Sequence, residues 1–114
     1  MVVGAASAAF PGRNGRIAYT RSTDVALHYD IFTMRSDGAV KRNITSSATD
    51  EFDPAWSADG TKIAFVEGFN GVNRVLVMNG DGTGVAPILD TPSFQFGPSW
   101  SPDGSELIFV RTPE

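Results

Sequence analysis

One stretch of this chain occurs twice. Residues 51–66 read EFDPAWSADGTKIAFV, residues 95–110 read QFGPSWSPDGSELIFV, and the two align without a gap. Trp56 and Trp100 therefore occupy equivalent positions, 44 residues apart. A period of about 40–45 residues is typical of the four-stranded blades of β-propellers. The repeat predicts a series of similar β-sheet units, because each unit needs a neighbour to cover its apolar faces.

A more divergent unit precedes these two copies. Met34 stands 44 residues before Met78, but the first unit has no tryptophan and reads Ala8-Ala9-Phe10 at its opening strand. The small apolar residues at the N-terminus fit either the remnant of an export signal or a degenerate first strand. We expect the chain to divide into residues 1–11 with one of these two roles, 12–50 as a first blade, 51–94 as a second blade, and 95–114 as the first half of a third.

Short apolar runs bounded by glycine, asparagine and aspartate predict the strands. The middle runs are apolar at successive residues, as in Ile63-Ala64-Phe65-Val66, which indicates sheets that are covered on both faces. No stretch has a sustained helical period. We therefore predict an all-β fold, a partial β-propeller of four-stranded antiparallel blades. The predicted strands are 16–21, 30–35, 40–44, 54–57, 61–66, 74–78, 85–89, 98–101 and 106–111.

Composition argues against several other classes of protein. Hydrophobic residues make up 41% of the chain and charged residues 19%, which is typical of a globular domain. The net charge is −4 and the basic residues are scattered, so we expect no nucleic-acid partner. The chain has no cysteine, which excludes disulfides and thiolate zinc sites. No apolar run approaches the length of a membrane span.

The repeated residues also resemble a known family. Residues 53–65, DPAWSADGTKIAF, and residues 75–84, VLVMNGDGTG, are similar to the WD40-like (PD40-type) repeat of TolB-type β-propellers, whose hallmark is P-x-W-S-P-D-G. Ala58 stands at the usual second proline. The resemblance implies a non-catalytic, extracytoplasmic scaffold, periplasmic or secreted, that binds a protein or peptide partner and needs no cofactor.

Two other functions stay open. Similar propellers precede the catalytic domain of serine peptidases of the prolyl-oligopeptidase type, so the first alternative is a segment of such an enzyme. The second is a lectin-like module in which Trp56 and Trp100 stack on sugars, although packing anchors between blades are the favoured interpretation of both. His28 is the only histidine and no G-x-S-x-G motif is present, so we expect no catalytic residues in this chain.

Blade geometry predicts where a partner would bind. The first and third connections of a four-stranded antiparallel blade share one end, and here both are tight Asp-Gly turns. The longer connections 22–29, 46–53, 67–73 and 90–95 fall at the opposite end, and binding residues concentrate on such loops. The candidate partner-binding residues are His28, Tyr29, Asp50, Glu51, Phe52, Phe69, Asn70 and Phe94.

An acidic cluster lies within this candidate face. Asp50, Glu51 and Asp53 are close in sequence, and Glu67 belongs to a neighbouring connection. Calcium takes about six to eight oxygen ligands, but the chain lacks the spaced acidic ladder of a calcium-binding loop. We interpret these residues as solvated acids and turn caps, and expect no tightly bound metal.

The number of blades bears on assembly. Closed propellers contain about four to eight blades, and 114 residues hold about two and a half at this period. The strand predicted at 106–111 would leave an apolar face and an unpaired edge, which tend to recruit another chain. We expect either self-association of two or three copies or the remainder of a longer propeller chain, and we favour self-association.

Overall fold

Three antiparallel β-sheets make up the part of the chain that the structure describes. The structure, a computed structural model, describes residues 15–23, 28–90 and 93–112. No helix is present in these ranges, and the all-β prediction is confirmed. The expectations for residues 1–11 lie outside them. The strands are β1 (Ile17–Ser22), β2 (Tyr29–Met34), β3 (Arg42–Asn43), β4 (Asp50–Trp56), β5 (Lys62–Phe69), β6 (Val72–Asn79), β7 (Ala86–Pro87), β8 (Gln95–Trp100) and β9 (Leu107–Arg111).

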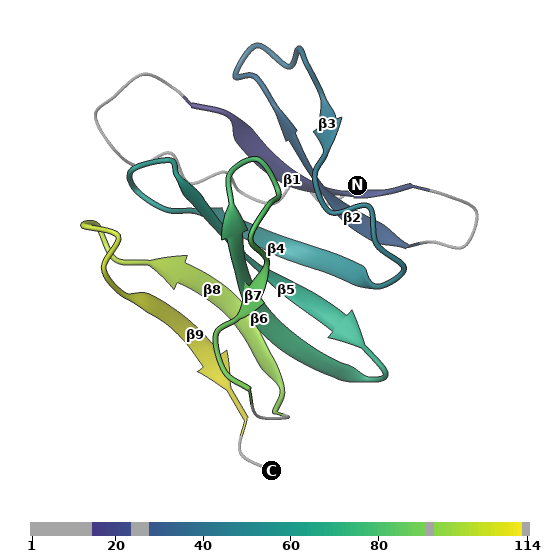
Figure 1. Cartoon of the computed structure of the whole chain (residues 1–114), viewed down its shortest axis with the longest axis vertical. Coiled ribbons are helices and arrows are strands. Elements are labelled where there is room, and N and C mark those ends of the chain that lie inside the picture. Colours follow the sequence, from purple (N-terminus) through teal and green to yellow (C-terminus); the bar gives the residue numbers. More distant parts are fainter. Residues whose placement is uncertain (1–14, 24–27, 91–92, 113–114) are drawn as a thin grey trace.

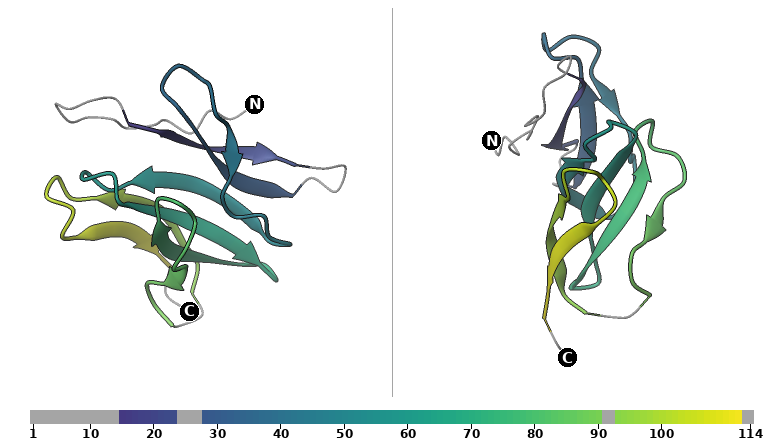
Figure 2. Two further views of the ribbon diagram at one scale, coloured as in Figure 1. Left: turned by 45° about the horizontal axis from the view of Figure 1, so that its top comes forward. Right: turned by 90° about the vertical axis from the view of Figure 1, so that its left-hand side faces the viewer.

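Each sheet is a simple up-and-down ladder. The strand orders are β1-β2-β3, β4-β5-β6-β7 and β8-β9, so every strand pairs with its neighbour in sequence (Figure 1). The sheets lie one over another in chain order, with the second sheet between the other two (Figure 2). Strand β4 contacts β1 and β2 of the first sheet, and β4, β5 and β6 all contact β8 of the third.

The core lies between the sheets. Ile63, Phe65 and Met78 in the second sheet form one buried cluster with Ala18 and Ile31 of the first. The cross-strand register of β5 alternates these residues with Ala64 and Val66. Both of the latter are fully buried, and their face of the sheet lies on the side of β8. The prediction that the middle strands are covered on both faces is confirmed for the second sheet, whereas Ile108 and Val110 in β9 leave one face of the third sheet exposed.

The prediction of loops at two places is wrong. Residues 67–73 form the tip of the β5–β6 hairpin, where Phe69 pairs with Val72 across a two-residue turn. Asn70 and Gly71 in that turn have φ of 51° and 77°. Positive φ at both central residues is the geometry that an Asn-Gly pair favours, so the polar residues close a hairpin instead of a loop. Residues 50–53, expected in another loop, belong to β4.

A bulge explains why β4 and β8 begin earlier than predicted. The register shifts between Phe52 and Ala55 in β4 and at the equivalent place in β8. Asp53 and Gly97, which are 44 residues apart, both have positive φ there, 52° and 64°. A bulge of this kind lets a strand continue past a proline, which cannot donate a ladder hydrogen bond.

The opposite ends of the hairpins carry the W-S-x-D-G motif. In the β4–β5 turn, the Asp59 carboxylate accepts hydrogen bonds from Ser57 Oγ at 2.7 Å and Thr61 N at 3.0 Å. Asp103 accepts equivalent bonds at 2.7 and 3.0 Å in the β8–β9 turn. These bonds hold the pKa of Asp103 down to about 2. The serine and aspartate of the motif therefore act as turn-forming residues.

The tryptophan of the motif joins neighbouring sheets. Trp100 Nε1 donates a 3.0 Å hydrogen bond to the backbone oxygen of Ala55, which ties β8 to β4. Trp56 is half-buried against the core cluster between the first two sheets. Trp100 is therefore a packing anchor with a carbonyl partner. Trp56 also packs between sheets, but its buried Nε1 has no hydrogen-bond partner among the described residues, so a carbonyl partner predicted for both indoles is found only at Trp100.

Candidate functional site

The loop end of the molecule, as we call it, comprises connections 23–28, 44–49, 70–71 and 88–94. Its described residues, 23, 28, 44–49, 70–71, 88–90 and 93–94, lie toward the right and the bottom of Figure 1, away from the Asp-Gly turns. Three aromatic side chains are exposed there: Tyr29 at 44%, Phe69 at 51% and Phe94 at 48%. Each stands at or next to a strand terminus in a different sheet. The loop end thus presents an exposed aromatic residue at each sheet: Tyr29 and Phe69 stand on hairpins, and Phe94 stands on the link that enters β8.

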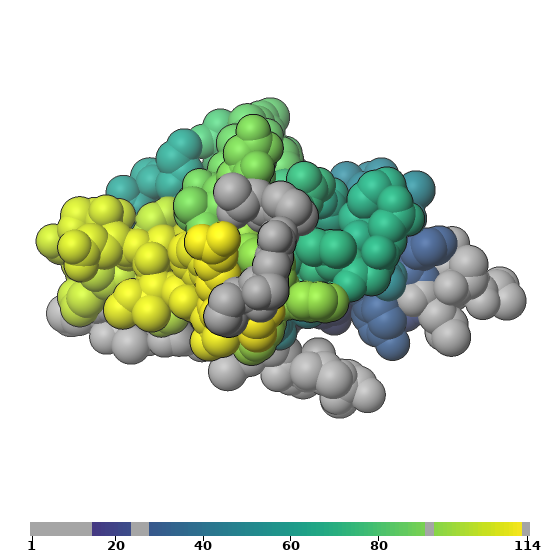
Figure 3. Space-filling model, turned by 90° about the horizontal axis from the view of Figure 1, so that it is seen from below, coloured from purple at the N-terminus to yellow at the C-terminus, as the bar shows by residue number. Residues whose placement is uncertain are grey.

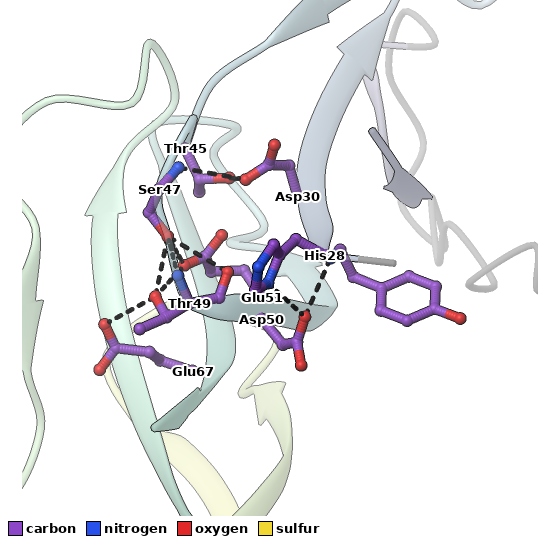
Figure 4. A network of polar contacts seen from close by, with 9 residues as sticks. His28, Asp30, Thr45, Ser47, Thr49, Asp50, Glu51 and Glu67 are labelled. Carbon is purple, nitrogen blue, oxygen red and sulfur yellow. Dashed lines mark hydrogen bonds and ion pairs between the residues drawn. The ribbon is translucent and has the colours of Figure 1, made fainter. Parts of the chain in front are cut away.

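His28 and Asp50 connect the first two sheets at this end. Asp50 Oδ1 accepts a 3.1 Å hydrogen bond from Tyr29 N and lies 3.6 Å from His28 Nδ1 (Figure 4). Both side chains are nearly half exposed, so the contact is an ion pair on the surface when the imidazole is protonated. Within the described part of the chain, no serine hydroxyl bonds to His28. The arrangement fixes Tyr29 and forms no nucleophilic triad.

Glu51 corrects the prediction of a solvated acidic cluster. Its residue is only 2% exposed, so its side chain is no surface contact for a partner. Glu51 Oε1 accepts hydrogen bonds from Ser47 Oγ and from Thr49 Oγ1, the latter at 2.6 Å (Figure 4). Its Oε2 is buried and has no hydrogen-bond partner among the described residues. Phe52 is half-buried. The accessible acids of this stretch are Asp53, which is exposed, and Asp50, whose side chain is nearly half exposed.

Asp30 is a second buried acid at the same junction, and the sequence analysis missed it. It is 3% exposed. Its Oδ2 accepts a 2.7 Å bond from Asn43 Nδ2, and its Oδ1 accepts 3.2 Å bonds from Thr45 Oγ1 and Ser47 N. In the sequence these donors look like an ordinary polar linker. Their acceptor, Asp30, lies at least 13 residues earlier in the sequence, so no local pattern connects them to it.

The two buried acids differ in their preferred charge state. Burial raises the pKa of Glu51, the hydroxyl donors Ser47 and Thr49 oppose this, and the neighbouring Asp30 carboxyl adds to it. Burial also acts to raise the pKa of Asp30, but hydrogen bonds led by those from Asn43 and Ser47 outweigh it and lower the pKa. The pair therefore favours a neutral Glu51 beside an ionised Asp30.

The remaining acid of the expected cluster is paired. Glu67 is the cross-strand neighbour of Glu51, and Arg74 is the cross-strand neighbour of Glu67 on the other side. Arg74 Nη2 lies 2.5 Å from Glu67 Oε2. Thr49 Oγ1 lies 3.4 Å from Glu67 Oε1, which joins this ion pair to the Glu51 network.

The junction between the second and third sheets has a similar network, in which a neutral residue takes the place of Glu51. Gln95 occupies the position equivalent to Glu51 and is fully buried. Its Oε1 accepts a 3.1 Å bond from Val75 N, and its Nε2 donates a 3.1 Å bond to Ser93 Oγ. Arg111, equivalent to Glu67, donates to the same Ser93 Oγ at 3.1 Å. Every polar side-chain atom of Gln95 has a partner.

The loop end carries few groups of the kinds that hold a metal ion. Among the described residues, no three acidic or histidine side chains are grouped to hold a metal ion. The described residues also contain no helix long and apolar enough to cross a membrane. What the loop end offers a ligand is exposed aromatic surface together with exposed carboxylates such as Asp50 and Asp90.

Comparisons with known proteins agree with the repeat. The family model described as the TolB beta propeller domain (PD40) matches residues 5–114. A TolB homolog of Chlorobium luteolum is 38% identical over 66 residues, 58% of this chain and 15% of that protein. Dipeptidyl-peptidase 5 of Porphyromonas gingivalis is 40% identical over 42 residues, 37% of this chain and 6% of that protein.

Solved structures give the same result. A TolB structure from Agrobacterium tumefaciens superposes with a TM-score of 0.75 and 26% identity, over 85% of this chain and 34% of that one. TolB from Acinetobacter baumannii also gives 0.75 and 26%, over 93% of this chain and 27% of its own length. The chain thus spans about a third or less of the proteins it matches. The stacked sheets have the arrangement of propeller blades, and the prediction of a partial β-propeller is confirmed.

Proposed function

Because the chain belongs to the TolB β-propeller domain family, we propose that it is a non-catalytic scaffold that binds a protein or peptide partner through its loop end. The observation that carries the proposal is the exposure of Tyr29, Phe69 and Phe94 at that end of three successive sheets. Large aromatic residues are enriched in protein interfaces because they bury much area with little loss of side-chain freedom. The opposite end consists of short turns fixed by Asp-Gly pairs.

The charges at the loop end indicate the character of the partner. Asp50 and Asp90 are solvent-accessible there, and the whole chain carries a net charge of −4. A partner segment with basic and apolar residues would complement both features, and long-range attraction would raise its association rate. The family to which the chain belongs supports a periplasmic or secreted location, which is part of the proposal.

Site-specific crosslinking tests this proposal. A photoreactive phenylalanine analogue replaces Phe69 in one variant, and Val85 in a control variant, because Val85 is also 51% exposed but lies toward the turn end. In an envelope extract of the source cells, we expect one discrete crosslinked protein from position 69 and none from position 85. Competition by the unmodified chain should remove the product, and a Tyr29→Ala/Phe94→Ala chain should compete poorly. Equal crosslinking from both positions would contradict binding at the loop end.

The match to a dipeptidyl-peptidase favours one alternative. The same repeat occurs in a protein named for peptidase activity, so this chain would be the propeller segment of a larger peptidase. In that case too, the residues described here would supply binding surface rather than the nucleophile. Hydrolysis of peptide esters or dipeptide substrates by the purified chain, with a rate abolished by His28→Ala, would contradict the non-catalytic proposal.

Self-association is the second part of the proposal. Ile108 and Val110 in β9 are 70% and 51% exposed, whereas their equivalents in β5, Ala64 and Val66, are fully buried under the third sheet. The third sheet therefore presents a blade-packing face that nothing in the described chain covers. A sheet of a second copy, or a further blade in a longer chain, would bury it in the way the second sheet is buried. Figure 3 shows the third sheet on one side of the stack and the first sheet on the other.

A further inference from the structure

The Glu51 network at the junction of the first two sheets has a property that the proposed function does not use. Glu51 comes from β4, its donors Ser47 and Thr49 come from the link between β3 and β4, and the nearby acid Asp30 comes from β2. The network therefore holds the link that enters the loop end against both sheets (Figure 4).

The hydroxyl protons are too few for the contacts in this network. Ser47 Oγ and Thr49 Oγ1 lie 2.8 Å apart, and both also contact Glu51 Oε1. Thr49 Oγ1 further approaches Glu67 Oε1 at 3.4 Å. Ser47 Oγ also lies 3.3 Å from the backbone oxygen of Thr49. Each hydroxyl has one proton to donate, so two protons serve five oxygen pairs. A proton on the Glu51 carboxyl supplies a third.

Burial points to the same charge state. Glu51 Oε2 is buried without a partner, so an ionised Glu51 would place negative charge on an atom that neither water nor a donor reaches. No nearby group compensates a negative charge on Glu51. Asp30 and Glu67 are themselves acids, and the Arg74 guanidinium already forms an ion pair with Glu67. Asp50 and its His28 partner lie at the exposed edge of the same strands. An unpaired buried charge is far more unfavourable than a neutral hydrogen-bonded group.

The chain contains its own neutral reference for this position. Gln95 is the equivalent residue, and it has the shape of a protonated glutamate without an ionisable group. Its amide is fully paired with Ser93 and Val75. The junction between the second and third sheets thus contains a side chain that is always neutral, Gln95. The junction between the first and second sheets contains Glu51, which can ionise.

We propose that the junction between the first and second sheets is a proton-dependent latch, in which Glu51 carries a proton when the link 45–49 is docked. Loss of that proton places an ionised carboxylate beside the Asp30 carboxylate in a buried site. The repulsion is relieved when the link moves away and water enters. The junction between the second and third sheets, built on Gln95, has no such dependence.

The expected sign follows from linkage. A group whose pKa is raised in the folded state stabilises that state fully below its unfolded pKa, and this stabilisation is lost as pH rises through the folded pKa. The equilibrium constant for unfolding should therefore increase as pH rises above about 4.3, by up to about tenfold per pH unit until the folded pKa of Glu51 is passed.

Urea unfolding of the full chain between pH 4.5 and 8 tests the latch. We expect this increase in the wild-type chain, its loss in Glu51→Gln, and its retention in Glu106→Gln, which removes an exposed glutamate. His28 is the same in all three chains, so its contribution cancels in the comparison. Equal slopes for the wild-type chain and Glu51→Gln would overturn the proposal.

A carboxyl ¹³C NMR titration of the wild-type chain gives the answer without any substitution. We expect the Glu51 carbon to titrate above the value of about 4.3 that is usual for a free glutamate, and the amide signals of Ser47 and Thr49 to shift at the same pH as Glu51. If Glu51 titrates at or below that usual value, the latch is wrong even if Glu51→Gln does not fold.

Discussion

At the residue scale, Asp53 has an unfavourable backbone conformation, and the equivalent residue of the other repeat, Gly97, suits that conformation better. Asp53 is exposed, has φ of 52° and makes no side-chain hydrogen bond to a described residue, while the equivalent Gly97 has φ of 64°. An L-residue is strained in this region and glycine is not. We expect Asp53→Gly to increase the free energy of unfolding by about 0.5–1 kcal/mol, measured by urea titration. Asp53→Ala keeps the strain and should give no gain, and a less stable Asp53→Gly would contradict this account of the bulge.

The turn aspartates make a second prediction at this scale, in the acid range. Their pKa values are lowered by serine, threonine and backbone donors, to about 2 for Asp103. A lowered pKa stabilises the folded state above the unfolded value of about 3.9, and the contribution disappears as pH falls through the folded pKa. We expect the Asp103 carboxyl carbon to titrate at about pH 2 by NMR. Ser101→Ala should move that titration upward, and an unchanged value would show that the hydroxyl is not the cause.

At the element scale, Gly80 fixes how closely the β6–β7 turn approaches the motif tryptophan. A Cβ on Gly80 would lie 2.7 Å from Trp56 Cζ3 and 2.9 Å from Cη2, which is too close for carbon atoms. Because the ring packs against the core, relief requires a shift in the core itself. We expect Gly80→Ala to destabilise the chain by about 1–3 kcal/mol. Gly15→Ala, where no atom lies within 4 Å, is the matched control, and equal stability of the two variants would contradict the packing described.

The positions of the strands could be predicted well from the sequence. Apolar runs and Asp-Gly pairs located each strand of the described residues to within a few positions, because both signals are local. The strand starts at Asp50 and Gln95 were missed since Pro54 and Pro98 look like strand beginnings unless a bulge precedes them. Burial of Glu51 was missed because it depends on Ser47 and Asp30, which other elements bring to it. A glutamine at the equivalent position was the one available hint.

At the scale of the whole molecule, the exposed face of the third sheet predicts self-association. Ile108 stands where Ala64 is fully buried in the second sheet, yet it is 70% exposed. We expect light scattering after size exclusion to show dimers or trimers at micromolar concentration, and Ile108→Asp to shift the population to monomer. Val40→Asp, an exposed residue far from this face, is the control. A compact, cooperatively melting wild-type monomer would contradict the prediction.

Hydrogen exchange can show directly whether the loop end binds a partner. Exchange of the backbone amides is measured by mass spectrometry with and without the protein captured by crosslinking at position 69. We expect partner-dependent protection in the segments around Tyr29, Asn70 and Phe94, with no change in the turns at Gly60 and Gly104. Protection of those turns, with an unchanged loop end, would contradict binding at the loop end.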